Sequence, residues 1–138
     1  MTVGGRHADQ VMLRERFGLD NLAEVRGLVR RAILAAGLHA DLAGQLTMAT
    51  AEGMANAIVH GGGFRVVTIS VVPEVGVIAE VYDDGQATAF APPSEVPPPD
   101  REGGRGLLLA CALCNRVSIT TGRAGTVLTL QMDYRRAP

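Results

Sequence analysis

Hydrophobic and polar positions along the chain predict two long helices and two pairs of strands. Apolar residues recur at helical spacing from Leu22 to Ala36 and again from Asp41 to His60. Two pairs of stretches are rich in β-branched residues on either side of a short turn: 64–72 with 75–83, and 116–121 with 125–133.

The ends of these elements carry their own signals. Asp20 and Asp41 stand at the start of the two apolar repeats and are the expected N-caps of the helices. Gly37 is expected to close the first helix, and the glycines 61–63 to end the second with a residue in the left-handed conformation. A weaker alternation over 11–17 predicts an edge strand.

The outer face of the first helix is charged. It carries Glu24, Arg26, Arg30 and Arg31. Such a face is either simply solvated or a docking surface for a protein partner.

The second helix carries a polar stripe on an otherwise apolar surface. Glu52, Asn56 and His60 are four residues apart and therefore share one narrow arc. A buried carboxylate is costly unless it is paired or bound, and Ala49 and Gly53 leave room beside it. We interpret the arc as facing a ligand; the alternatives are that Glu52 pairs with a buried arginine and that His60 only packs at the helix end.

Two adjacent aspartates are expected to point in opposite directions. In the strand 75–83 the period of two places Asp83 in the core-facing row with Val81, whereas Asp84 should point outward or into the following loop.

The stretch from Gly85 to Gly106 has no periodicity and holds five of the seven prolines. A loop of this length inside a compact domain is typically functional, and we predict a lid over about 85–103. The glycine-rich run 103–106 precedes an apolar helix predicted over 107–114, so its N–H groups either bind phosphate or form a plain turn.

Length and composition restrict the function further. The 138 residues fit one domain, expected over 11–138 after a disordered stretch over 1–10. The net charge of −1 argues against a nucleic-acid partner. Neither a leader nor a membrane span is recognisable, so a cytoplasmic protein without a membrane partner is expected. All 13 basic residues are arginines, which excludes any lysine-based chemistry.

Cys111 and Cys114 form a Cys-x-x-Cys pair. Zinc binding would need a second pair of ligands, and redox chemistry would need the pair at the start of a helix that follows a strand. Buried thiols are therefore the preferred interpretation.

The order of elements defines the fold class. It reads strand, two helices, strand pair, lid, helix and strand pair. We predict an α+β two-layer sandwich with an antiparallel or mixed sheet and helices on one face, rather than a parallel doubly wound sheet.

Three separated motifs resemble those of one superfamily. The run from Glu52 to Gly61, EGMANAIVHG, resembles the N box of the GHKL ATPases, which have the Bergerat fold. The run DDGQA that begins at Asp83 is similar to the Asp-x-Gly-x-Gly box, and the run 104–107 to a later Gly-x-Gly box. Within the superfamily, the anti-sigma factor serine/threonine kinases are the most similar in chain length and in the sequence of the N box.

The resemblance implies a role for each matching residue. Glu52 would be the general base, Asn56 would bind Mg²⁺, and Asp83 would accept the amine of the adenine of ATP. Gly85 and Thr126 would line the adenine site. The phosphates would lie against Gly104, Arg105, Gly106 and Leu107.

One position departs from the pattern. Ala87 stands where the second glycine of the Asp-x-Gly-x-Gly box is expected, and its methyl group would strain a positive φ.

The resemblance implies an ATP- and Mg²⁺-dependent kinase that phosphorylates an anti-sigma-antagonist protein, binds a sigma factor and forms a homodimer. The alternative is a nucleotide-binding switch of the same fold without catalysis.

Overall fold

The structure is a computed structural model, and it describes residues 10–85, 112 and 114–134. Its elements, in chain order, are β1 (Gln10–Arg16), α1 (Leu22–Ala35), α2 (Ala40–His60), β2 (Arg65–Val72), β3 (Gly76–Asp83), β4 (Arg116–Gly122) and β5 (Gly125–Asp133).

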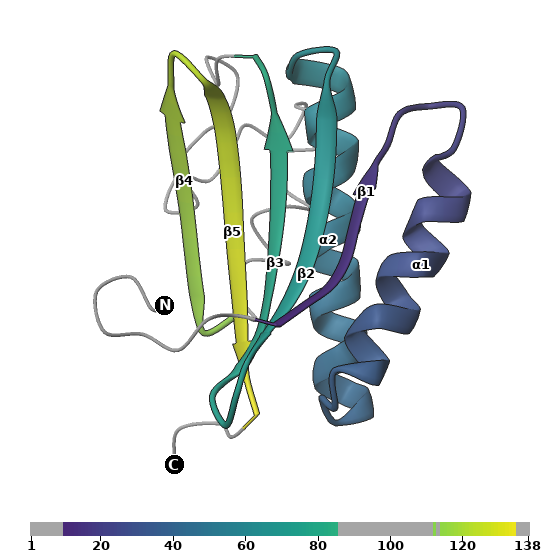
Figure 1. Cartoon of the computed structure of the whole chain (residues 1–138), viewed down its shortest axis with the longest axis vertical. Helices are drawn as coiled ribbons and strands as arrows, with labels where there is room; N and C mark the ends of the chain where they lie inside the picture. Colours follow the sequence, from purple (N-terminus) through teal and green to yellow (C-terminus); the bar gives the residue numbers. More distant parts are fainter. Residues whose placement is uncertain (1–9, 86–111, 113, 135–138) are drawn as a thin grey trace.

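The strands form one antiparallel sheet with the order β1-β2-β3-β5-β4 (Figure 1). The predicted edge strand is therefore confirmed as β1, and both predicted strand pairs are hairpins. Gln10, which was expected in a disordered terminus, is the first residue of β1 and pairs with Val71. Residues 1–9 lie outside the described part of the chain.

Both helices lie on the same face of the sheet, α1 beside β1 and α2 behind the central strands (Figure 1). The core lies between the two layers. Its fully buried members from the helices include Ile33, Leu46 and Met54, and those from the sheet include Ile69, Leu128, Leu130 and Met132. The α+β two-layer architecture expected from the sequence is confirmed.

The N-caps of both helices differ from the prediction. The cap of α1 is Asn21 instead of Asp20, and the Asn21 side chain bonds backward, to Gly18 N–H and to the carbonyl of Arg16. The cap of α2 is His39 instead of Asp41, and His39 Nδ1 accepts the Asp41 N–H at 3.4 Å. A side chain therefore caps a helix N–H only in α2, whereas the Asn21 side chain holds the turn before α1.

Gly37 has a φ of +98° just after α1, which confirms that a left-handed residue follows this helix.

Cys114 is half-buried and packs against the core, as the interpretation of a structural thiol expects, while Cys111 is outside the described residues. The predicted helix 107–114 is likewise outside, apart from Ala112 and Cys114. In the described part, neither helix has the length and apolarity required to cross a bilayer.

Candidate functional site

The C-terminal end of α2 and the end of β3 meet at the carboxylate of Asp83. This side chain is 2% exposed, which confirms its predicted inward direction, whereas Asp84 is exposed. Asp83 Oδ1 accepts two backbone hydrogen bonds, from Gly62 N–H at 3.0 Å and from Gly85 N–H at 2.8 Å. Because both bonds go to Oδ1, the described residues leave Oδ2 without a donor.

The glycines after α2 allow this close contact. A Cβ on Gly61 would lie 2.6 Å from Asp83 Cγ, and one on Gly62 would lie 1.9 Å from Asp84 Oδ1 and 2.5 Å from Gly85 N. Gly61 itself is extended, with φ −96° and ψ −166°, and none of the three glycines has a positive φ. The prediction of a left-handed residue here was wrong: the glycines provide space for the neighbouring loop, not an unusual backbone angle.

Strand β5 closes the other side of this loop. Thr126, which is 1% exposed, pairs with Asp83 across the sheet, and its hydroxyl donates to the carbonyl of Gly85 at 2.9 Å. Gly125 has a φ of +125°, and a Cβ there would lie 2.3 Å from the carbonyl oxygen of Asp83. Three predicted site residues, Asp83, Gly85 and Thr126, are therefore in direct contact.

The open face of the sheet also fixes the loop after α2. Phe64 N–H donates to Asp84 Oδ1 at 3.1 Å, and the Phe64 ring meets the Tyr82 ring edge-on at 6.2 Å between centroids. Arg16 stacks over the Phe64 ring at 4.5 Å. These contacts hold the segment that positions Asp83 from the side opposite to the helices.

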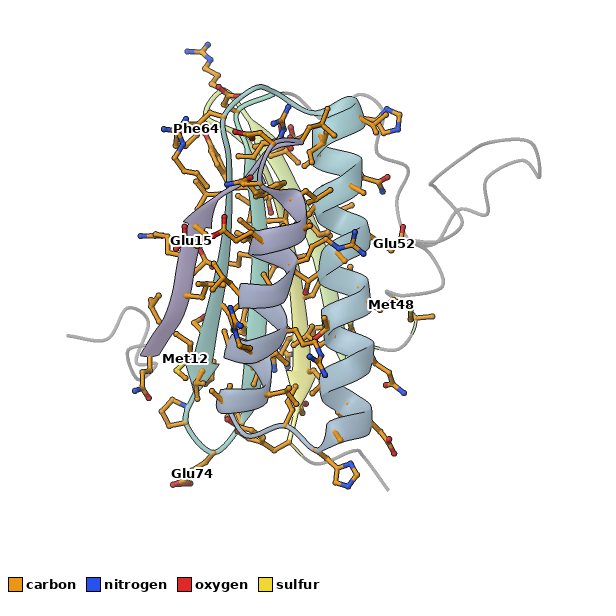
Figure 2. The ribbon with its side chains drawn as sticks, turned by 90° about the vertical axis from the view of Figure 1, so that its right-hand side faces the viewer. Met12, Glu15, Met48, Glu52, Phe64 and Glu74 are labelled. Carbon is orange, nitrogen blue, oxygen red and sulfur yellow. The ribbon has the colours of Figure 1, made fainter. Side chains whose placement is uncertain are left out.

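The polar stripe of α2 begins two turns before this loop. Asn56 is 7% exposed, yet its side-chain amide has no hydrogen-bond partner among the described residues. A buried amide without a partner is costly, about 1–3 kcal/mol, so this group calls for a ligand. Glu52, one turn earlier, is half-buried, and Figure 2 shows it projecting from the side of α2 that faces away from the sheet, as Met48 does.

Gly53 brings this part of α2 close to the sheet. A Cβ at Gly53 would lie 2.6 Å from Leu128 Cδ2 and 3.5 Å from Val81 Cγ2. The glycine therefore provides contact with the sheet rather than free space for a ligand, which corrects the expectation from the sequence. Ala49, also expected to leave room, is 0% exposed and belongs to the core. His60 is exposed at the last turn of α2.

The residues present fit a magnesium ion that is shared with a phosphate group. Within the described part of the chain, no group of three or more His, Cys, Asp or Glu side chains is arranged to hold a metal alone. Mg²⁺ usually takes only one or two protein oxygens and completes its shell with water and substrate phosphates. The amide oxygen of Asn56, which has no partner in the described part of the chain, suits such a site.

Some predicted residues cannot be placed. Ala87 and the phosphate-binding run of Gly104, Arg105, Gly106 and Leu107 lie outside the described residues, as does most of the predicted lid. The sequence reasoning also missed the Gly62 N–H that orients Asp83. The three consecutive glycines were the feature of the sequence that could have indicated this contact, but glycines after a helix are explained equally well as the end of the helix.

Comparison with known proteins identifies the family. The sequence matches the histidine kinase-like ATPase domain over residues 17–132, and the chain belongs to this family. ATP is therefore its expected ligand. No match was found among curated proteins.

Two solved structures are similar in fold. The RsbU and RsbW domains of Rv1364c from Mycobacterium tuberculosis superpose with a TM-score of 0.62 at 22% identity over 87% of this chain. The histidine kinase domain of the blue-light activated histidine kinase from Erythrobacter litoralis EL346 gives 0.53 at 21% identity over 80%. The chain spans 32% of the former structure's chain and 60% of the latter.

Proposed function

We propose that this chain is an ATP- and Mg²⁺-dependent serine/threonine protein kinase of the anti-sigma type. The observation that carries the proposal is the buried amide of Asn56 without a described partner, one helical turn from the carboxylate of Glu52. The similarity to a structure that contains an RsbW domain supports the choice of this branch.

The proposed site assigns the two ends of the nucleotide to different elements. Asp83 Oδ2 accepts a hydrogen bond from the exocyclic amine of adenine, while the Gly62 and Gly85 N–H groups donate hydrogen bonds to Oδ1. Asn56 would hold Mg²⁺ through its side-chain oxygen, and the ion would supply positive charge to the phosphates. Because α2 ends directly at the loop that holds Asp83, one helix sets the distance between the two ends.

In the proposed reaction Glu52 is the general base. The Glu52 carboxylate takes the proton of a serine or threonine hydroxyl, and the hydroxyl oxygen forms a bond to the γ-phosphorus of ATP. The bond from that phosphorus to the β–γ bridging oxygen breaks, so that ADP leaves. The products are a phosphorylated side chain, ADP and a proton, which Glu52 returns to solvent.

The proposed acceptor is an anti-sigma-antagonist protein, and the proposed second partner is a sigma factor bound by a homodimer of this chain. Ala87 favours a second candidate, a nucleotide-binding switch without phosphotransfer, because the methyl group replaces the second glycine of the Asp-x-Gly-x-Gly box.

The test is incubation with γ-labelled ATP, Mg²⁺ and candidate antagonist proteins. We expect label on a serine or threonine of the antagonist, and its loss in Glu52→Gln but not in Glu24→Gln, an exposed carboxylate on α1. Calorimetry with ADP should show that Glu52→Gln still binds nucleotide. Nucleotide binding without transfer to any antagonist would favour the switch, and equal transfer by Glu52→Gln would refute the assigned base.

A further inference from the structure

A groove of about 620 Å³ runs between α1 and α2. Its floor is apolar and buried, with Val29 from α1 and Ala43 and Met54 from α2. Its width comes from small residues on both helices, Gly27, Ala40, Gly44 and Ala51. A groove of this size accepts several side chains of a peptide segment.

The α1 wall of the groove is positively charged. Arg26 and Arg30 both line it, four residues apart on α1. Neither forms an ion pair with an acidic side chain in the part of the chain that the structure describes. Two like charges at this spacing repel each other, and both side chains are exposed, so this wall of the groove favours an anionic partner.

The α2 wall of the groove includes the proposed general base. Glu52 lines the groove together with Met48, and Figure 2 shows these two side chains on the same side of α2. Four residues on a helix correspond to a rotation of about 40°, so Met48 and Asn56 lie on opposite sides of Glu52. Asn56 does not line the groove. Glu52 therefore lies between the groove and the side of α2 that carries the proposed magnesium ligand.

We propose that this groove binds the acceptor protein through an acidic segment that carries the serine or threonine to be phosphorylated. Carboxylates of the segment pair with Arg26 and Arg30, an apolar side chain rests on the floor, and the hydroxyl reaches Glu52 from the groove side. This rests on the proposed kinase function, and it adds the chemistry of the acceptor and the surface that selects it.

The test measures binding separately from transfer. Three fluorescein-labelled peptides of equal length, with one serine and one leucine, would be flanked by glutamate, glutamine or lysine. Fluorescence anisotropy is measured on the full chain with ADP and Mg²⁺. We expect the glutamate peptide to bind tightest and to weaken as salt is raised to about 0.5 M, because surface ion pairs are screened.

The arginines of α1 supply matched variants. The double variant Arg26→Ala/Arg30→Ala should bind the glutamate peptide about tenfold more weakly, while Arg31→Ala should bind it as the parent does, because Arg31 is exposed on the same helix but does not line the groove. Reversal to Arg26→Glu/Arg30→Glu should shift the preference to the lysine peptide.

The two proposals fail in different ways. The proposal that the groove binds the acceptor would be overturned if the chain showed no preference for the glutamate peptide, or if Arg31→Ala lost as much affinity for it as the double variant. Selective binding without phosphate transfer from γ-labelled ATP would leave the groove intact and count against the kinase. Absence of ADP binding in calorimetry would count against the nucleotide site itself.

Discussion

The loop after α2 allows a sharp test, because two neighbouring glycines differ in their surroundings. Gly62 contacts the loop that follows β3, and a methyl group there would lie 1.9 Å from Asp84 Oδ1 and 2.5 Å from the backbone nitrogen of Gly85. A methyl group on Gly63 would have nothing within 4 Å. Neither glycine has a positive φ, so backbone strain does not distinguish them. Gly63→Ala is therefore a matched control for Gly62→Ala.

The expected cost of Gly62→Ala follows from these contacts. The Gly85 nitrogen belongs to the backbone and cannot rotate away, so the two loops must separate, and the 3.0 Å hydrogen bond from Gly62 N–H to Asp83 Oδ1 lengthens. A hydrogen bond to a charged group contributes about 1.5–3 kcal/mol, and overpacking costs about 1–3 kcal/mol. We expect Gly62→Ala to lose about 3 kcal/mol of unfolding free energy. Gly63→Ala should be neutral or gain about 0.5 kcal/mol, because alanine restricts the unfolded chain.

Urea denaturation of the two variants and the parent measures this difference. In the same samples, calorimetry with ADP should show affinity reduced at least tenfold in Gly62→Ala, about 1.4 kcal/mol, because Asp83, the proposed acceptor for adenine, is no longer held. Equal unfolding midpoints for the two variants would refute the packing argument. A destabilised Gly62→Ala that binds ADP like the parent would refute the role of Gly62 in orienting Asp83.

Three further predictions concern the other side chains of the site. Asn56→Ala should leave the free energy of unfolding, measured by urea denaturation, within about 1 kcal/mol of the parent or raise it, since the buried amide has no described partner. ADP titrations of this variant with and without Mg²⁺ should become the same, and retained metal dependence would exclude Asn56 as the ligand. Asp83→Asn should weaken ADP binding at least tenfold by calorimetry, and unchanged affinity would mean that adenine is bound elsewhere. Gly53→Val should lower the free energy of unfolding by about 1–3 kcal/mol or more, and with it the melting temperature, through its overlap with Leu128, whereas a melting temperature like that of the parent would show that α2 can move away freely.

Much of the fold could be predicted because its signals are local. The alternation that places Asp83 in one row with Val81 needs only the period of a strand, and it correctly separated Asp83 from Asp84. The two hairpins followed from β-branched stretches around short turns. The four-residue spacing of Glu52 and Asn56 likewise needs only the geometry of a helix.

The remaining features depend on contacts between distant parts of the chain. Position 61 has no room for a Cβ because Asp83, far away in the sequence, lies against it, and no helix-end rule contains that information. Gly53 was interpreted as room for a ligand because the sequence does not show that Leu128 lies against it. The N-cap of α1 is Asn21 rather than the predicted Asp20, and the Asn21 side chain also bonds to Arg16 and Gly18. The sequence does not decide between these two adjacent candidates.

The position of α2 explains why its polar stripe is tolerated in a buried layer. The helix is 21 residues long, and its sheet-facing side, which includes Leu46 and Met54, is fully buried in the core. That burial stabilises the helix by about 1.5–3 kcal/mol for each large apolar side chain, so the two together outweigh the cost of about 1–3 kcal/mol for the Asn56 amide, which has no hydrogen-bond partner among the described residues. The same packing fixes the orientation of α2, so the buried amide cannot turn toward another group. A polar group that the core holds in place, without a hydrogen-bond partner among the described residues, is thus preorganised for a ligand, and the strongly packed side of α2 supports the proposal that its other side binds one.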